Sequence, residues 1–151
     1  MATPTTIITM YASHLFQDTS KNMFNKIWDL VHEKHDFVKE VMESLDLISK
    51  VELAESIVRD MNQEMKENHV TMNHTLELAL TQLSDIISQI HEFMKKLKEG
   101  VEFHKTLWFS WLRTPEYLTI LDKLKIDKII LDERIDNLIK VITLFKESNI
   151  K

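Results

Sequence analysis

Histidines and carboxylates are the residue types in this sequence that could bind a metal or transfer protons. Asp29 and His32 lie three residues apart on a stretch with helical spacing. This spacing imitates half of the Glu-x-x-His pair that a di-iron helical bundle uses. The chemistry needs a second such pair, and the sequence contains no other Asp-x-x-His or Glu-x-x-His. We therefore expect the seven histidines to be surface or cap residues, and we predict no metal site and no cofactor.

Residues for phosphate binding or nucleophilic catalysis are equally sparse. Gly100 is the only glycine, so no glycine-rich phosphate loop can form. Ser13 and His14 are neighbours in the sequence, and we interpret this adjacency as accidental. Asp132 and Asp136 have the four-residue spacing of solvated side chains on a helix surface. The sequence therefore predicts a protein that is not an enzyme.

The strongest pattern in the chain is an apolar stripe between residues 76 and 97. Its members follow one another at alternating steps of four and three residues, and polar residues fill the positions between them. Such spacing places one apolar stripe on one side of a helix. Because this stripe is unfavourable in water, other parts of the chain must cover it. The stripe consists of Leu76, Leu80, Leu83, Ile87, Ile90, Met94 and Leu97.

Three further stretches carry comparable stripes. Residues 20–48 are predicted to form one long helix, and the capping-box spacing of Ser49 and Glu52 predicts the start of the next. An apolar turn within residues 5–16 is expected either to pack on the end of the bundle or to lie at a membrane interface. The second and last helices are expected to bury Val51, Ala54, Val58, Met61, Met65, Leu121, Leu124, Leu131, Ile135, Leu138, Ile142 and Phe145.

Local signals set the expected limits of the later helices. Asn73 or Thr75 is predicted to cap the third helix, and Gly100 to end it in the left-handed conformation. Residues 101–113 are predicted to form a short extra helix, and Pro115 to occupy the first turn of the last helix. The fold class is therefore all-α, an antiparallel four-helix bundle with a short brace helix between the third and fourth helices. A long coiled coil that dimerises to complete its core is the rival architecture.

Length and composition favour one helical domain over residues 1–151. One glycine and two prolines leave few positions for tight turns, as long helices require. The absence of cysteine favours an intracellular protein, and a formal charge of −5 argues against nucleic-acid binding. We expect a cytoplasmic protein that can be recruited to a membrane. The end of the chain after the fourth helix is compatible with the N-terminal domain of a longer protein.

Positive charge is concentrated near the aromatic residues. Residues 95–128 contain eight basic and five acidic groups, whereas residues 1–94 are acidic in balance. Lysine and arginine beside tryptophan are typical of a contact with anionic lipid, and also of a brace with its aromatic side chains inside. The candidate residues for binding a membrane or partner are Lys95, Lys96, Lys98, Lys105, Trp108, Trp111 and Arg113.

The order of these elements resembles a known family of signalling domains. An apolar turn at Ile7 and Ile8 is followed by a long helix with Trp28, and the stretch 76–97 is followed by an aromatic segment and a last helix. This layout is similar to the N-terminal four-helix bundle of the mixed-lineage kinase domain-like pseudokinase and to HeLo and RPW8-type domains. The resemblance implies a cell-death or immune-signalling domain that oligomerises and binds or perforates membranes.

Two functions therefore remain open from the sequence. The first is a non-enzymatic signalling bundle that forms homo-oligomers and associates with or permeabilises anionic membranes. The second is a scaffold or adaptor, for example a pathogen protein that binds a host partner through a helix face without membrane activity. The second function is suggested by apolar residues outside the stripes, namely Leu47, Ile126, Ile129, Ile130 and Val141.

Overall fold

All the regular secondary structure in the described part of the protein is helical. The computed structural model describes residues 21–30, 36–112 and 115–149. Residues 21–30 are helical, and the elements that follow are α2 (Asp36–Ser44), α3 (Leu47–Asn68), α4 (His74–Thr106), the 3-10 helix η1 (Ser110–Leu112) and α5 (Leu118–Asn149). The all-α class is thus confirmed for these ranges, while the predicted turn within residues 5–16 lies outside them.

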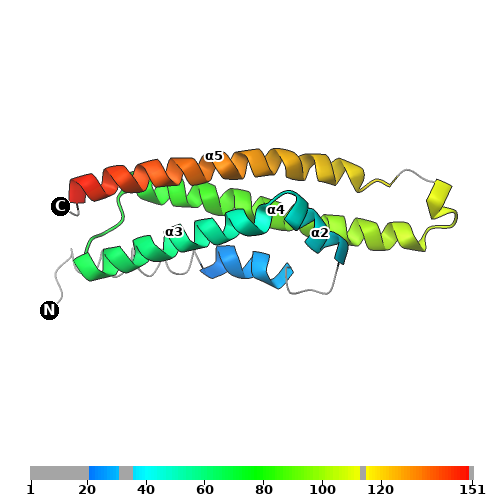
Figure 1. Cartoon of the computed structure of the whole chain (residues 1–151), viewed down its shortest axis with the longest axis horizontal. Helices are drawn as coiled ribbons and strands as arrows, with labels where there is room; N and C mark the ends of the chain where they lie inside the picture. The colour runs from blue at the N-terminus through cyan, green and yellow to red at the C-terminus, as the bar shows by residue number, and fades with distance from the viewer. Residues whose placement is uncertain (1–20, 31–35, 113–114, 150–151) are drawn as a thin grey trace.

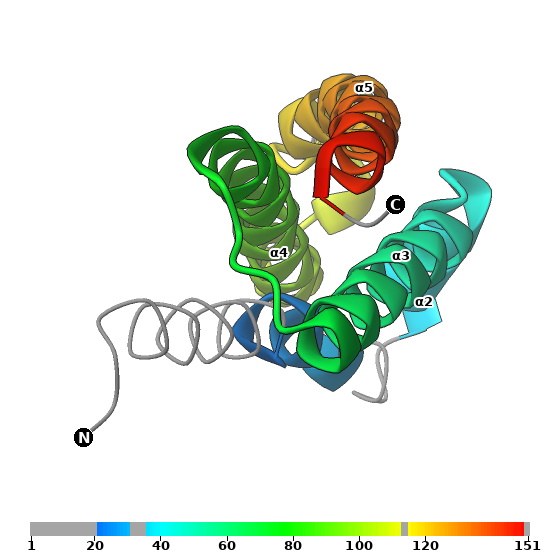
Figure 2. The same cartoon turned by 90° about the vertical axis from the view of Figure 1, so that its left-hand side faces the viewer.

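A long hairpin of α4 and α5 forms the axis of this elongated molecule (Figure 1). The two helices are antiparallel, and contacts join Gln82 to Arg134 and Gln89 to Asp127 across them. α3 runs antiparallel to α4 and parallel to α5, as Figure 2 shows from one end. The hairpin extends past α2 and α3 at one end, where η1 lies (Figure 1).

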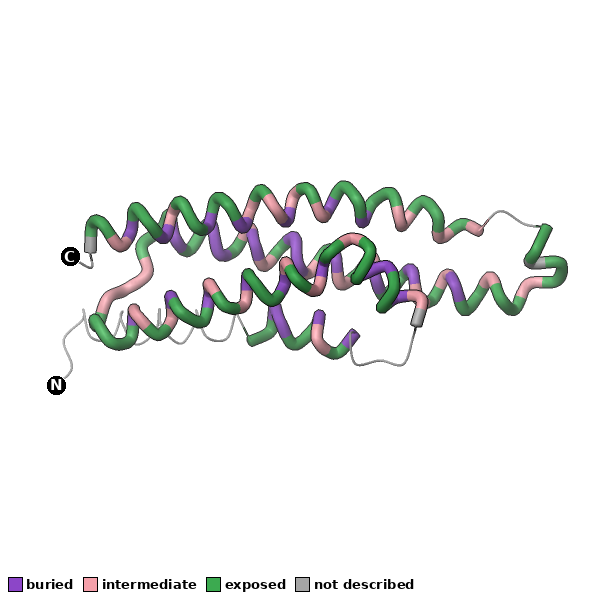
Figure 3. Tube along the Cα trace, viewed as in Figure 1, coloured by how far each residue is buried: buried purple, intermediate pink, exposed green. Residues whose placement is uncertain are grey.

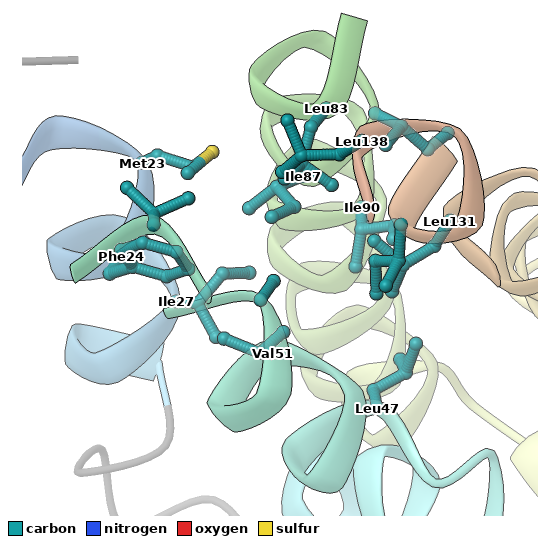
Figure 4. Close-up of a cluster of buried hydrophobic side chains, with 14 of the residues drawn as sticks. Met23, Phe24, Ile27, Leu47, Val51, Leu83, Ile87, Ile90, Leu131 and Leu138 are labelled. Carbon is teal, nitrogen blue, oxygen red and sulfur yellow. The ribbon is translucent and has the colours of Figure 1, made fainter. Parts of the chain in front are cut away.

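The core lies where α4 packs against the segment 21–30, α2, α3 and α5. Figure 4 shows Ile27 from the segment 21–30, Val51 from α3 and Leu131 from α5 directed toward Ile87 and Ile90 of α4. All seven members of the predicted stripe between residues 76 and 97 are at most 3% exposed. The predicted core positions of α3 are also buried, as are six of those of α5, while Leu121 is half-buried.

The prediction of one helix over residues 20–48 is wrong. α2 ends at Ser44, and α3 begins at Leu47 rather than at the predicted capping box of Ser49 and Glu52. Between the two helices Asp46 has a φ of 57°, in the left-handed region that aspartate tolerates better than most residues. The turn brings Leu47 into the core with no exposed surface, so Leu47 is not one of the surplus apolar residues either.

The predicted end of the third helix at Gly100 is also wrong. α4 continues through Gly100 to Thr106, so residues 101–106 extend this helix and only Ser110–Leu112 form a separate short one. A Cβ atom on Gly100 would lie 3.0 Å from the Cβ of Tyr117. The glycine therefore permits the close approach of the chain that enters α5, and no left-handed turn is needed there.

Of the residues predicted to begin the last two long helices, Asn73 has its predicted role and Pro115 does not. Asn73 caps α4 as predicted, because its Oδ1 accepts a hydrogen bond of 2.8 Å from the backbone N–H of Leu76. Pro115 is not in the first turn of the last helix. α5 begins at Leu118, and the proline carbonyl accepts the N–H of that residue in a preceding turn.

Candidate functional site

The candidate site is the aromatic end of the α4–α5 hairpin. We call the side chains of Phe103, Lys105, Trp108, Phe109, Trp111 and Leu112 the hairpin tip. Trp108 is 83% exposed and Trp111 is 78% exposed, and the three other apolar members are each at least 61% exposed. Figure 3 shows this end of the hairpin as largely exposed. Five exposed apolar side chains at one end of an elongated molecule form a surface suited to an external contact.

The local backbone explains why these side chains face outward. α4 ends when Leu107 adopts an extended conformation, and Phe109 then has a φ of 57°. A bulky residue in the left-handed region is unusual and costs about 1 to 2 kcal/mol. The carbonyl of Phe109 accepts the N–H of Leu112 at 2.9 Å, which closes the short helix η1. The chain thus reverses with its aromatic side chains on the outside.

The aromatic rings of the hairpin tip contact one another rather than the core. The ring centroids of Trp108 and Phe109 are 6.5 Å apart, and those of Phe109 and Trp111 are 6.4 Å apart, with the second pair edge-to-face. This arrangement contradicts the alternative of a brace whose aromatic side chains lie inside. The tip instead presents a small preformed aromatic cluster to the solvent.

The structure does not bring all the predicted basic residues together. Lys95, Lys98 and Lys105 follow at steps of three and seven residues along one side of α4, because each residue turns the helix by about 100°. Lys96 lies on a different side, at seven residues from Phe103. Lys95, Lys96 and Lys105 are exposed and Lys98 is half-buried, while Arg113 lies outside the described residues.

A second basic residue, which the sequence prediction missed, accompanies Lys96. The ammonium groups of Lys96 and Lys123 lie 5.8 Å and 5.5 Å from the ring centroid of Phe93. Lys123 belongs to α5, and only the register of the antiparallel hairpin places it opposite Phe93. The hydrophobic pattern of each helix alone contains no information on that register, so no signal in the sequence would have paired these residues.

Among the residues that the structure describes, the titratable group with a shifted pKa lies away from the hairpin tip. Asp127 is buried between α4 and α5, and burial raises the pKa of its carboxyl group above the ordinary value of 3.8. A hydrogen bond of 2.8 Å from the Gln89 side chain and the positive charge of Arg134 oppose this shift. In the described ranges, no group of three histidine, aspartate or glutamate residues could hold a metal ion.

The helices of the described ranges fall short of what a transmembrane segment needs. None of the helices in the ranges described has the length and apolar character needed to cross a bilayer.

Comparison with known proteins gives one partial similarity. No protein-family model matches the chain, and no solved structure matches it. An uncharacterized protein, L717, of Acanthamoeba polyphaga mimivirus is 30% identical over 66 residues. The similar segment covers 44% of this chain and 32% of the viral protein, so the match spans about a third of that relative's length.

Proposed function

We propose that this protein is a non-enzymatic helical protein that associates with membranes through its hairpin tip. The observation that carries the proposal is the exposure of Trp108 and Trp111 at the end of the α4–α5 hairpin. Tryptophan favours the membrane–water interface, because its ring is apolar while its N–H can still form a hydrogen bond. Lys105 at the same end supplies a cation for anionic headgroups.

The apolar surface of the two tryptophans is sufficient for a measurable contribution. A tryptophan side chain has about 200 Å² of surface to bury, so the exposed fractions of Trp108 and Trp111 correspond to about 300 Å². At about 25 cal/mol per Å², complete removal of this area from water would contribute about 7 kcal/mol. Insertion into the interface removes part of that area and supports peripheral, reversible binding.

The signalling role in this proposal comes from the family resemblance. We assign the protein to the class of HeLo-like cell-death or immune-signalling bundles, in which a four-helix bundle with a brace oligomerises and acts on membranes. Support for the bundle architecture comes from the shared core of the segment 21–30, α3, α4 and α5. In this proposal the protein is cytoplasmic and reaches the membrane when its tip is accessible.

Vesicle co-sedimentation tests the membrane contact. We expect the wild-type protein to sediment with vesicles of phosphatidylcholine and phosphatidylserine, and the Trp108→Ala/Trp111→Ala variant to bind at least tenfold more weakly. The matched control is Leu53→Ala, since Leu53 is an exposed apolar residue on α3, far from the tip. Wild-type protein that stays in the supernatant, or equal losses for both variants, would contradict the proposal.

The charge of the tip allows a second comparison in the same assay. Lys105→Glu should weaken binding to vesicles that contain phosphatidylserine and change binding to pure phosphatidylcholine less, because the aromatic contribution does not depend on lipid charge. Equal binding of Lys105→Glu and wild type to the anionic vesicles would remove the electrostatic part of the proposal and leave the aromatic part.

A protein-interaction scaffold is the second candidate function. It is favoured by Ile126 and Ile129 on α5, which are 58% and 59% exposed. Ile130 and Val141 are half-buried against the core and offer less surface than the sequence suggested. The scaffold function predicts that the wild-type protein remains in the supernatant with all vesicles, which distinguishes it from the membrane proposal.

A further inference from the structure

The outer side of α5 carries a second stripe that the core does not use. Its members are all exposed and follow one another at steps of 4, 4, 3, 4, 3, 4 and 4 residues. This spacing keeps them on one side of the helix, turned away from the buried stripe. Figure 3 shows that side of α5 as exposed along most of its length. The outer stripe consists of Leu118, Asp122, Ile126, Ile129, Glu133, Asp136, Lys140 and Leu144.

The apolar members of the outer stripe are large and accessible. Leu118 is 44% exposed, Ile126 and Ile129 are 58% and 59% exposed, and Leu144 is 63% exposed. A surface helix usually carries polar residues on the side opposite the core. Four large apolar residues on that side of one helix therefore indicate a contact with another helix.

The step pattern of the outer stripe is the same when read from either end. Two copies of α5 in antiparallel orientation can therefore superimpose the stripe on itself. In that register Leu118 meets Leu144 of the other copy and Asp122 meets Lys140, while Ile126 meets Asp136 and Ile129 meets Glu133. A two-fold axis repeats each contact, as in the self-complementary interfaces of symmetric dimers.

The flanks of the stripe agree with the same register. Lys125 lies beside the stripe on the side that faces Asp136 of the other copy, which adds a second kind of ion pair. Ile129 of one copy lies within about 6 Å, along the helix axis, of Ile129 of the other, because four residues rise about 6 Å. The pairing thus has apolar contacts at both ends and ion pairs next to them, while at its centre Ile126 and Ile129 lie beside Asp136 and Glu133 of the other copy.

Other arrangements of the two helices place like charges together. Parallel pairing brings Asp122, Glu133 and Lys140 each against its own copy. Antiparallel pairing shifted by seven residues brings Asp122 against Glu133 in one direction and Glu133 against Asp136 in the other. Like charges that face each other across helices are unfavourable, so both of these arrangements are disfavoured relative to the register with Asp122 opposite Lys140.

The charged side chains of Asp122 and Lys140 are available for this contact. Neither Asp122 nor Lys140 takes part in an ion pair within the ranges that the structure describes, whereas Asp132 and Lys146 on other sides of α5 pair with Lys50 and Glu64 of α3 at 3.3 Å and 3.0 Å. We propose that the outer stripe of α5 is a homodimer interface, in which two copies pair antiparallel with Asp122 opposite Lys140.

Charge reversal and rescue test this register. In sedimentation equilibrium without lipid, we expect wild type to dimerise as concentration rises, and Asp122→Lys or Lys140→Asp to weaken the dimer at least about tenfold, because each substitution changes two symmetric pairs. The Asp122→Lys/Lys140→Asp variant restores both pairs and should dimerise like wild type. Lys39→Asp, at an exposed position on α2, is the matched control. A monomeric wild type, or a double variant weaker than either single one, would overturn the proposal.

Cysteine crosslinking tests the same contact with a geometric readout. The chain has no cysteine, so an introduced one reports on its own position. Leu118→Cys and Leu144→Cys should each remain uncrosslinked on mild oxidation, because the same position in the two copies lies about 39 Å apart along the helix axis. A mixture of the two variants should form a disulfide-linked heterodimer. Crosslinking of either variant with itself, or none in the mixture, would contradict the antiparallel register. Both tests are made without membranes, so their outcome is independent of the function proposed for the hairpin tip.

Discussion

The buried carboxyl group of Asp127 makes a stability prediction whose sign and size follow from the structure. Asp127 is 2% exposed, its Oδ1 accepts a hydrogen bond of 2.8 Å from Gln89, and Arg134 contributes a favourable charge. A hydrogen bond to a charged group contributes about 1.5 to 3 kcal/mol. Gln89→Leu should therefore lower the free energy of unfolding at pH 7 by about 2 kcal/mol, since the carboxylate stays buried without this donor.

The pH dependence of the same site has the opposite sign to that of an exposed ion pair. Burial raises the pKa of Asp127 above 3.8, so the folded state binds this proton more tightly than the unfolded state. The contribution of Asp127 to stability is therefore most favourable below the ordinary pKa, and it is lost as pH rises through the raised pKa. Asp127→Asn removes this dependence and should be at least as stable as wild type at pH 7, with its relative advantage decreasing toward pH 4.

Urea unfolding of a double-mutant cycle measures both effects. The cycle compares wild type, Gln89→Leu, Asp127→Asn and the double variant at pH 7 and pH 4. We expect Gln89→Leu to cost less in the Asp127→Asn background, because the remaining hydrogen bond is to a neutral group. A free energy of unfolding that rises for wild type relative to Asp127→Asn between pH 4 and pH 7 would refute the reasoning, as would a negligible cost of Gln89→Leu.

Three further substitutions probe the core, a cap and the strained turn, each by urea unfolding. Ile90→Ala should cost about 3 kcal/mol, because Ile90 has no exposed surface and its loss leaves a cavity; a cost below about 1 kcal/mol would contradict its central position. Asn73→Ala should cost about 1 kcal/mol through the lost cap of α4, with no effect if the cap is not formed. Phe109→Gly should leave stability unchanged or raise it by about 1 kcal/mol, because glycine adopts a φ of 57° freely; a clear loss would show that the ring contributes to folding.

The helices of the core could be predicted from their periodicity. The stripe between Leu76 and Leu97 is buried because steps of four and three residues keep side chains on one side of any α-helix. The turn at Asp46 could not be predicted in this way. Apolar periodicity continues through it, and the chain turns there so that Leu47 can enter the core, which depends on the positions of the other helices.

Gly100 shows how a local signal can be outweighed by tertiary packing. A glycine near the end of an apolar stripe usually marks a helix end. Here it lies inside α4, because the chain before α5 passes within contact distance at Tyr117. That contact joins residues brought together by the hairpin, and the sequence around Gly100 carries no sign of it.

The candidate site was predictable in its aromatic part and less so in its charges. The clustering of Trp108 and Trp111 within a few residues indicated either a surface contact or a brace, and the exposure of both side chains contradicts the brace alternative with buried rings. The lysines from residue 95 to residue 105 appear as one basic stretch in the sequence. On α4 they occupy different sides, so the basic residues are divided between one side with Lys95, Lys98 and Lys105 and another where Lys96 joins Lys123 of α5 beside Phe93.

Fluorescence quenching by brominated lipids tests the central claim most directly. Trp28 is half-buried and its Nε1 donates a hydrogen bond to Glu55 at 3.1 Å, so Trp28→Phe leaves emission from the two tip tryptophans alone. In vesicles of phosphatidylcholine and phosphatidylserine with brominated acyl chains, the emission of this variant should shift to shorter wavelength and be strongly quenched. Emission that stays at the wavelength of water-exposed tryptophan, with no quenching at saturating lipid, would contradict membrane contact by the hairpin tip.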